Sequence, residues 1–222
     1  MGRENDLHRA LEVLEREGLL LLADSSLPSV VTLVAGEPVR GSWWGHPKGN
    51  AIYWLSLSLA SHRDVLVAKL VSAKVTFVHR RLWPAVVSVG SARQAWQLDG
   101  LPPEARALLD LVTADGAVRT DLIEWSGGMR SRRLGEAARE LERRLLVHVE
   151  EVHTDSGAHA KVLETWEAWA SQAGLSLEGL DSERAMRELE ALLVALNERY
   201  SAQARLPWQA TATRRPRTPR RR

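Results

Sequence analysis

Residues 40–50 combine side chains that stack on flat rings with side chains that bind anions. Trp43 and Trp44 are adjacent, and His46 and Lys48 follow at alternate positions. Indole rings stack on nucleobases, while an ammonium or imidazole group binds phosphate or a polar edge of a base. Three glycines and a proline in the same run favour a loop over regular structure. The run therefore predicts a loop with the chemistry to contact a nucleic acid.

The two tryptophans also have a purely structural interpretation, since a bulky ring often fills a core while glycines permit the turns around it. On this basis we expect Trp44 to be the buried ring, which leaves Trp43 for a base. His46 has no second histidine or acid at ligand spacing nearby, so no metal centre is expected in this loop. The sequence also lacks a phosphate-binding glycine loop and a His-Glu-x-x-His cluster, and we expect no cofactor.

Residues 101–163 have the element order of a winged helix-turn-helix. The expected elements are a helix over 102–112, a short second helix from Asp121 to Trp125 or Ser126 with Thr120 as its cap, a third helix beginning near 131, and strands over 146–152 and 158–163. Val118 stands between the first two helices as an isolated apolar residue. The two strands would form a hairpin, the wing, and the third helix would enter a DNA major groove.

The third helix has one apolar face and one charged face. The apolar face consists of Leu134, Ala137, Ala138, Leu141 and Leu145, which recur at helical spacing. On the opposite face Arg132, Arg139 and Arg143 point outward, as they would in a recognition helix. Glu136 and Glu140 lie among them, so the charges also fit a solvated face whose ions pair with one another. The sequence leaves both interpretations open.

A second group of cations follows a predicted hairpin. Residues 65–71 and 74–79 are rich in β-branched side chains and are separated by a two-residue turn. A helix is expected over 80–89, and it begins with Arg80 and Arg81. The free N–H groups of a helix start also attract anions, so we interpret these arginines as candidate phosphate contacts.

Short runs along the chain carry a resemblance to a known family. They are Leu27-Pro28-Ser29, the run 40–44 and the run 69–78, followed by the winged helix. Together, over roughly residues 7 to 170, they resemble the AlkZ-related proteins, which are relatives of the AlkZ-type winged-helix DNA glycosylases. The resemblance implies the fold and a link to DNA.

The resemblance does not extend to the catalytic motif. AlkZ-type glycosylases use two glutamines, or a glutamine and an aspartate, separated by one apolar residue. The nearest pair here is Gln94 and Gln97, whose spacing is wrong. The leading hypothesis is therefore a DNA-binding protein without base-excision activity and without catalytic residues. The alternatives are an active glycosylase with a displaced catalytic set, for which Glu37 and Asn50 are the candidates, and a winged helix used for protein association.

The expected partner is double-stranded DNA, intact or damaged. The residues expected to contact it are Arg130, Arg132, Arg133, Arg139, Arg143, Trp43, His46, Lys48, Arg80 and Arg81. A helix over 182–200 carries a further apolar stripe, which would pack on the body or form a homodimer with a second copy. The stripe is too short and irregular for a coiled coil.

The fold class expected is α+β. The expected divisions are an N-terminal α/β subdomain over 1–98, the winged helix-turn-helix over 99–165, C-terminal helices over 166–205, and a disordered basic tail over 206–222. Within them we also expect a helix that ends at Gly18, a strand over 19–22, a helix from 27–29 through 34, a helix capped by Asn50, and a helix capped by Thr165.

Composition narrows the class of protein further. The chain has 222 residues, no cysteine and no apolar run long enough for a membrane span, so we expect no disulfides, no membrane contact and a cytoplasmic location. Its formal charge of +2 becomes −4 without the six arginines of residues 213–222. A slightly acidic body with a basic tail lacks the basic surface of a dedicated DNA binder, although such a tail can add phosphate contacts.

Overall fold

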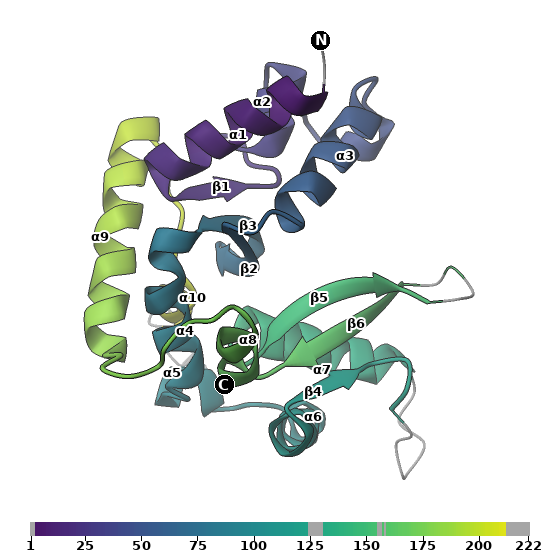
Figure 1. The fold of residues 1–222 in the computed structure, drawn as a ribbon, viewed down its shortest axis with the longest axis vertical. Coiled ribbons are helices and arrows are strands. Elements are labelled where there is room, and N and C mark those ends of the chain that lie inside the picture. Colours follow the sequence, from purple (N-terminus) through teal and green to yellow (C-terminus); the bar gives the residue numbers. More distant parts are fainter. Residues whose placement is uncertain (1–2, 124–130, 155–156, 158, 212–222) are drawn as a thin grey trace, which may run out of the picture.

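The structure is a computed structural model that describes residues 3–123, 131–154, 157 and 159–211. It has the predicted α+β fold, with helices packed around two three-stranded antiparallel sheets in the described part of the chain. Figure 1 shows an upper and a lower arm that project from a column of helices. No helix among the described residues is both long enough and apolar enough to cross a bilayer.

The upper arm contains the first sheet. Its elements are α1 (Arg3–Glu17), β1 (Leu19–Leu21), α2 (Val30–Ala35), the 3-10 turn η1 (Trp43–Gly45), α3 (Gly49–Ala60), β2 (Val65–Val71) and β3 (Lys74–His79). The strand order is β1-β3-β2. On one face of the sheet, Leu20 and Phe77 pack with Leu14 and Ile52 of the helices. Alternate strand residues such as Leu21 point to the other face and join a second core.

The end residues of α2 explain why it is helical. Val30, Val31 and Thr32 are β-branched, and propensity alone would make them a strand. Ser29 accepts a hydrogen bond from the backbone N–H of Thr32 at 3.2 Å, and Gly36 ends the helix with φ 92°. The helix predicted from 27–29 through 34 is therefore confirmed, and its capping residues outweigh its propensity.

The hairpin predicted over 65–79 is also confirmed. Ser72 and Ala73 both have positive φ, 51° and 56°, as a type I′ turn requires. A 3-10 turn, η2 (Arg80–Leu82), leads from β3 into α4 (Trp83–Ser91), where Pro84 occupies the first helical turn. Asn50 does not cap α3 as predicted, because the helix already begins at Gly49 and makes no side-chain capping bond.

The lower arm contains α6 (Pro103–Asp115), β4 (Ala117–Arg119), α7 (Ser131–Arg143), β5 (His148–His153) and β6 (His159–Glu164). Its sheet has the order β4-β6-β5. Leu108, Leu141 and Leu163 are buried in a third core between the two helices and this sheet. The predicted third helix and hairpin strands are present, and Val118 proves to be part of a strand rather than an isolated apolar residue.

The second helix predicted for the winged helix-turn-helix is not present where the chain is described. Residues 120–123 form a turn and a bend, and the remainder of the predicted segment lies outside the described residues. Thr120 does not cap a helix, because its hydroxyl accepts a hydrogen bond from the backbone N–H of Lys161 at 2.9 Å. Its own N–H donates to the carbonyl of Lys161, so it continues the pairing of β4 with β6.

The column consists of α4, α5 (Ala95–Leu98), α8 (Trp166–Gln172), α9 (Ser182–Tyr200) and α10 (Pro207–Thr211). α8 is capped by Thr165 as predicted, and α9 has the predicted bounds. α9 lies along α4, and its buried residues Leu189, Leu193 and Leu196 belong to the same core as Val86. The stripe that suggested a homodimer is thus covered within one chain, and dimerisation stays a prediction.

The ordered chain extends further than the predicted start of the basic tail at 206. Leu206 and Trp208 are buried, and the indole Nε1 of Trp208 donates to Glu190 at 2.5 Å. The prediction of disorder is therefore wrong for residues 206–211, because two apolar side chains fix this segment on α5 and α9. The arginine-rich remainder, 212–222, lies outside the described residues.

Candidate nucleic-acid interface

α7 exposes arginines along its outward face, and most of them are held by carboxylates. Arg132 pairs with Glu136 at 3.1 Å, and Arg133 pairs with Glu104 of α6 at 3.4 Å. Arg143 pairs with Glu140. Arg139 differs, since within the described residues it makes no ion pair and donates from Nε to the carbonyl of Gly135 at 2.9 Å. Arg130, which was also predicted to contact DNA, lies outside the described residues.

The pairs of Arg132 and Arg133 are exposed on both sides, so they hold these arginines only weakly. Glu140, which is 16% exposed, keeps Arg144 as a second partner if Arg143 leaves it. Arg132 and Glu136 are 87% and 55% exposed, and such pairs contribute about 0 to 1 kcal/mol. An incoming phosphate can therefore replace a glutamate as the partner of Arg132 or Arg143. The glutamates nevertheless cancel much of the net positive charge of this face, which reduces its long-range attraction for a polyanion.

Behind its exposed face, α7 is tied to both sheets by Glu142. One oxygen of this carboxylate, Oε2, accepts from Lys69 of β2 at 2.9 Å and from Lys161 of β6 at 3.0 Å. Glu142 is only 13% exposed. The pair of contacts links the upper arm to the lower arm, and it fixes the orientation of α7 relative to the hairpin β5–β6.

A histidine and a glutamate form a second tie at the base of the hairpin. Nδ1 of His148 lies 2.8 Å from Oε1 of Glu164, and Oε2 of Glu164 accepts from Gln172 of α8 at 2.9 Å. Both ring and carboxylate are nearly buried. No group of three potential metal ligands occurs among the described residues. The nearly buried His148 and Glu164 side chains, bonded to each other and to Gln172, hold the hairpin against α8.

In the loop of residues 40–50 the roles of the two tryptophans are reversed from those predicted. Trp44 is 65% exposed, whereas Trp43 is partly buried against the core that contains Ile52. The two rings stack with centroids 4.2 Å apart. The prediction that Trp44 fills the core is therefore wrong, because the short η1 turn directs Trp43 inward and leaves Trp44 on the surface.

His46 and Lys48, two predicted contacts, support the loop. The ammonium of Lys48 donates to the carbonyls of Val34 at 2.8 Å and Ala35 at 3.4 Å, which belong to the last turn of α2. Nδ1 of His46 accepts from the backbone N–H of Lys48 at 3.1 Å. Lys48 thus occupies the negative end of a helix dipole, and its side chain remains exposed.

Arg80 and Arg81 likewise have partners within the chain. Arg80 pairs with Asp64 at 3.0 Å, and Arg81 donates to the carbonyls of Glu15 and Arg16 in the last turn of α1. Burial and the charge of Arg81 lower the pKa of His79, so this imidazole favours its neutral form. Arg81 is therefore a helix-end contact whose loss would disturb α1.

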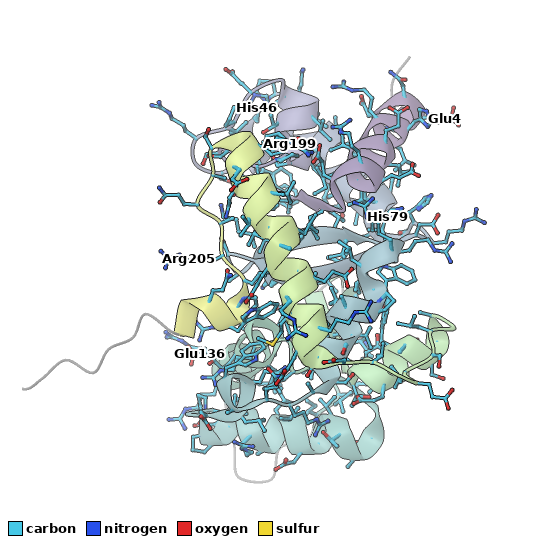
Figure 2. All side chains as sticks on the ribbon, turned by 90° about the vertical axis from the view of Figure 1, so that its left-hand side faces the viewer. Glu4, His46, His79, Glu136, Arg199 and Arg205 are labelled. Carbon is cyan, nitrogen blue, oxygen red and sulfur yellow. The ribbon has the colours of Figure 1, made fainter. Side chains whose placement is uncertain are left out.

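The predicted contacts form two separate groups and not one surface. Figure 2 shows His46 near one end of the long axis and Glu136 of α7 toward the other, with His79 between them. The α7 group belongs to the lower arm, and the loop group belongs to the upper arm.

The nearest glutamine pair in the sequence is used for packing. Gln97 is fully buried, and its amide donates to the carbonyls of Arg144 at 3.1 Å and Leu145 at 3.3 Å. Its Oε1 accepts from the backbone N–H of Gln94 at 2.8 Å. Gln94 in turn bonds Trp96 and Ser182. Neither side chain is free to act on a substrate.

Other candidate residues become visible only in the structure. Tyr53 of α3 lies beside Trp44, with ring centroids 5.5 Å apart, and Trp54 lies beside Tyr53, with centroids 5.6 Å apart. No role was predicted for either residue from the sequence. The signal that could have identified them is the aromatic pair at positions that do not follow the spacing of the buried face.

Comparison with known families gives one match. The model of the family described as AlkZ related matches residues 5–205, which is nearly the whole described chain. No curated protein and no solved structure matches the sequence significantly.

Proposed function

Because the chain belongs to the AlkZ-related family, we propose that it is a DNA-binding protein that contacts duplex DNA through α7 and the hairpin β5–β6 and does not excise bases. Membership relates it to the AlkZ-type DNA glycosylases, and hence to DNA repair. The observation that carries the proposal is the arrangement of the lower arm. A helix, α7, lies on a three-stranded sheet whose last two strands form a hairpin, as in a winged helix.

The side chains of α7 suit backbone contacts more than base recognition. Arg139 has no carboxylate partner in the described part of the chain, so it is the arginine most available to a phosphate or a guanine edge. Arg132 and Arg143 can exchange their glutamates for phosphates at small cost. We therefore expect moderate affinity that depends strongly on salt, for intact and damaged duplexes alike.

The spacing and the hydrogen bonds of the two glutamines support the proposal that the protein does not excise bases. Hydrolysis of a glycosidic bond requires a polar group that stabilises the charge developing on the sugar. Gln94 and Gln97 have the wrong spacing, and both are occupied by hydrogen bonds within the protein. Glu37 and Asn50 are exposed, and they come from the upper arm, away from α7.

A titration of fluorescent duplex DNA with the full chain tests the proposal. Arg139→Ala should weaken binding and reduce the slope of log affinity against log salt by about 0.9, the value for a single phosphate interaction. Arg187→Ala is the matched control, because Arg187 is an exposed helical arginine on α9, which is part of the column and not of the lower arm. Equal slopes for the two variants, or no duplex binding at low salt, would contradict the proposal.

The ion pairs along α7 favour a second function, in which the lower arm binds another protein. Three of its arginines already have acidic partners, and a mixed charge pattern is typical of protein surfaces. In that case affinity for DNA would come only from the basic tail. The Arg139→Ala titration separates the two functions, since a protein-binding arm would leave the salt slope of DNA binding unchanged.

A further inference from the structure

The surface of the upper arm carries a row of aromatic rings, which we call the aromatic platform: Trp43, Trp44, Tyr53 and Trp54. Neighbouring rings lie 4.2, 5.5 and 5.6 Å apart between centroids. Trp54 is 42% exposed, and Leu57, close by on α3, is 39% exposed. With Trp44 they make three of the six exposed large hydrophobic residues in the described part of the chain. Their clustering indicates a binding surface, because scattered exposure is the ordinary case.

The platform is held in place before any ligand arrives. Trp43 packs on the core, and its carbonyl accepts from the N–H of His46 at 3.0 Å. The N–H of Gly49 donates to the carbonyl of His46 at 2.7 Å. A Cβ at Gly49 would lie 3.0 Å from the carbonyl oxygens of Trp43 and Trp44, so η1 sits tightly on the start of α3. A preorganised surface loses little conformational entropy on binding.

Three cations that contact the platform or lie close to it in the sequence, Arg3, Arg40 and Lys48, make no ion pair within the described residues. The guanidinium of Arg3 lies 5.2 Å from the centre of the Trp54 ring. Lys48 bonds only to carbonyl oxygens, and Arg40 is exposed and makes no ion pair within the described residues. Arg40 and Lys48 flank η1 in the sequence, and both side chains are exposed, so their charges favour an anion as the ligand of this loop.

We propose that the aromatic platform binds unpaired nucleobases of single-stranded DNA by stacking, with Arg3, Arg40 and Lys48 contacting the phosphates. This inference rests on the proposed function, since it assigns a second DNA contact to the upper arm while α7 binds duplex. Rings flanked by cations are the usual surface for single strands, because every base has a face that stacks. Bases within a duplex are already stacked on one another and present only their edges.

The composition of the platform favours this ligand over a lipid surface. Leu57 is the one large aliphatic side chain of α3 that is exposed beside the platform, so a bilayer would gain little from this surface. Trp44 presents a large ring beside Tyr53, and Arg3 covers part of Trp54. The surface therefore offers flat ring faces together with cations, and a single strand offers bases and phosphates as their partners.

The test measures binding of the full chain to a fluorescent oligothymidylate of 12 nucleotides and, in parallel, to a duplex of the same length. Trp44→Ala and Trp54→Ala should each weaken single-strand binding by about 5- to 100-fold, the usual range for removal of one stacking partner. Trp44→Phe should retain most of the affinity. Val194→Ala is the matched control, because Val194 is 52% exposed on α9, away from the platform. Both tryptophans are exposed, so the variants should keep the melting temperature of the parent.

The outcomes separate this inference from the proposed function. Loss of single-strand binding in Trp44→Ala and Trp54→Ala, with duplex binding retained, supports the platform. Unchanged single-strand binding in both variants would overturn it even if Arg139→Ala still impaired duplex binding. Association with anionic phospholipid vesicles that is abolished in Trp44→Ala, without any effect on oligothymidylate, would also overturn it in favour of a membrane surface. Absence of duplex binding in the parent chain would instead count against α7 as an interface.

Discussion

Gly90 of α4 lies directly against the indole ring of Trp166 at the start of α8. A Cβ added at Gly90 would come within 2.6 Å of the ring carbon Cε2. Trp166 is 1% exposed, and its Nε1 donates to the carbonyl of Leu145 at 2.7 Å, which leaves the ring no space to move. The packing of Gly90 on Trp166 holds α8 against α4, and the hydrogen bond from Trp166 to Leu145 joins the column to the lower arm just after α7.

Gly90→Ala should therefore destabilise the protein, because the new methyl group overpacks a filled core and displaces the indole from its hydrogen bond. We expect a decrease of about 1 to 3 kcal/mol in the free energy of unfolding, measured by urea denaturation. Gly45→Ala is the control, since nothing lies within 4 Å of its added Cβ. A Gly90→Ala variant as stable as Gly45→Ala would show that α8 can shift away from α4.

The two faces of α7 should respond differently to truncation. Leu141 is fully buried between α6 and the second sheet, so Leu141→Ala should cost about 2 to 5 kcal/mol of stability. Arg143 is exposed and pairs with Glu140 alone among the described residues, so Arg143→Ala should cost under about 1 kcal/mol. Thermal or urea unfolding measures both. Small and equal losses would mean that α7 presents a different face to the core.

Glu17 should make the free energy of unfolding depend on pH in the acidic range. Burial raises the pKa of this carboxyl, but hydrogen bonds from Arg16 and Tyr200 and the charge of Arg199 outweigh it, so the pKa lies below its ordinary value of 4.5. The unfolded chain therefore binds a proton more readily than the folded one. The stabilisation is complete above the ordinary pKa and disappears as the pH falls through the lower, folded value.

Glu17→Gln should remove this dependence and lower stability by about 1 to 2 kcal/mol at neutral pH, because the charged acceptor of three hydrogen bonds becomes neutral. The measurement is the urea midpoint across the acidic range, with exposed Glu15→Gln as the control. Parallel pH curves for the parent and Glu17→Gln would contradict the assignment. The experiment also reports on α9, since Arg199 and Tyr200 join it to α1.

Local signals made much of the fold predictable from the sequence. Ser29 and Thr165 mark helix starts with their own hydroxyls, and Gly36 marks an end by its left-handed backbone. The apolar spacing of α9 is equally local. Each of these features depends on residues that are close together in the sequence. The order of residue types along the chain was therefore sufficient to predict these helices.

The candidate site was harder to predict because tertiary contacts redirect its cations. Arg81 donates to the carbonyls of Glu15 and Arg16, which lie more than sixty positions earlier in the chain. Lys48 donates to a carbonyl at the end of α2. A sequence shows that such a cation is exposed but not which helix end it meets. Trp43 and Trp44 are identical in type and adjacent, so only the η1 turn decides which ring faces the core.

The arginine-rich tail should contribute phosphate contacts that the body lacks. Truncation after Ala212 removes six arginines and no acid. The slope of log affinity for duplex DNA against log salt should then fall by about 0.9 for every phosphate that the truncated chain no longer binds. Arg139→Ala in the truncated chain should lower the slope further if α7 also binds. A slope unaffected by truncation would show that the tail binds no phosphate.

The purified protein should not release a modified base from DNA. A glycosylase must extrude a nucleotide and also stabilise the charge that develops on its sugar. The aromatic platform can serve the first requirement, but Gln94 and Gln97 cannot serve the second, because Gln97 is buried and bonded to backbone carbonyls. The platform and the glutamines also belong to different parts of the fold, the upper arm and α5.

The decisive assay incubates alkylated and crosslinked oligonucleotides with protein in excess of the DNA and looks for abasic product. We expect none above the level of a no-protein control. Product that persists through purification and disappears in Glu37→Gln or Asn50→Ala would establish a displaced catalytic group in the upper arm. Both residues are exposed, so these substitutions should leave the fold intact and affect activity alone. That result would overturn the proposal that the protein does not excise bases and identify it as an active glycosylase. Contacts between α7 and duplex DNA would still be required to hold the substrate.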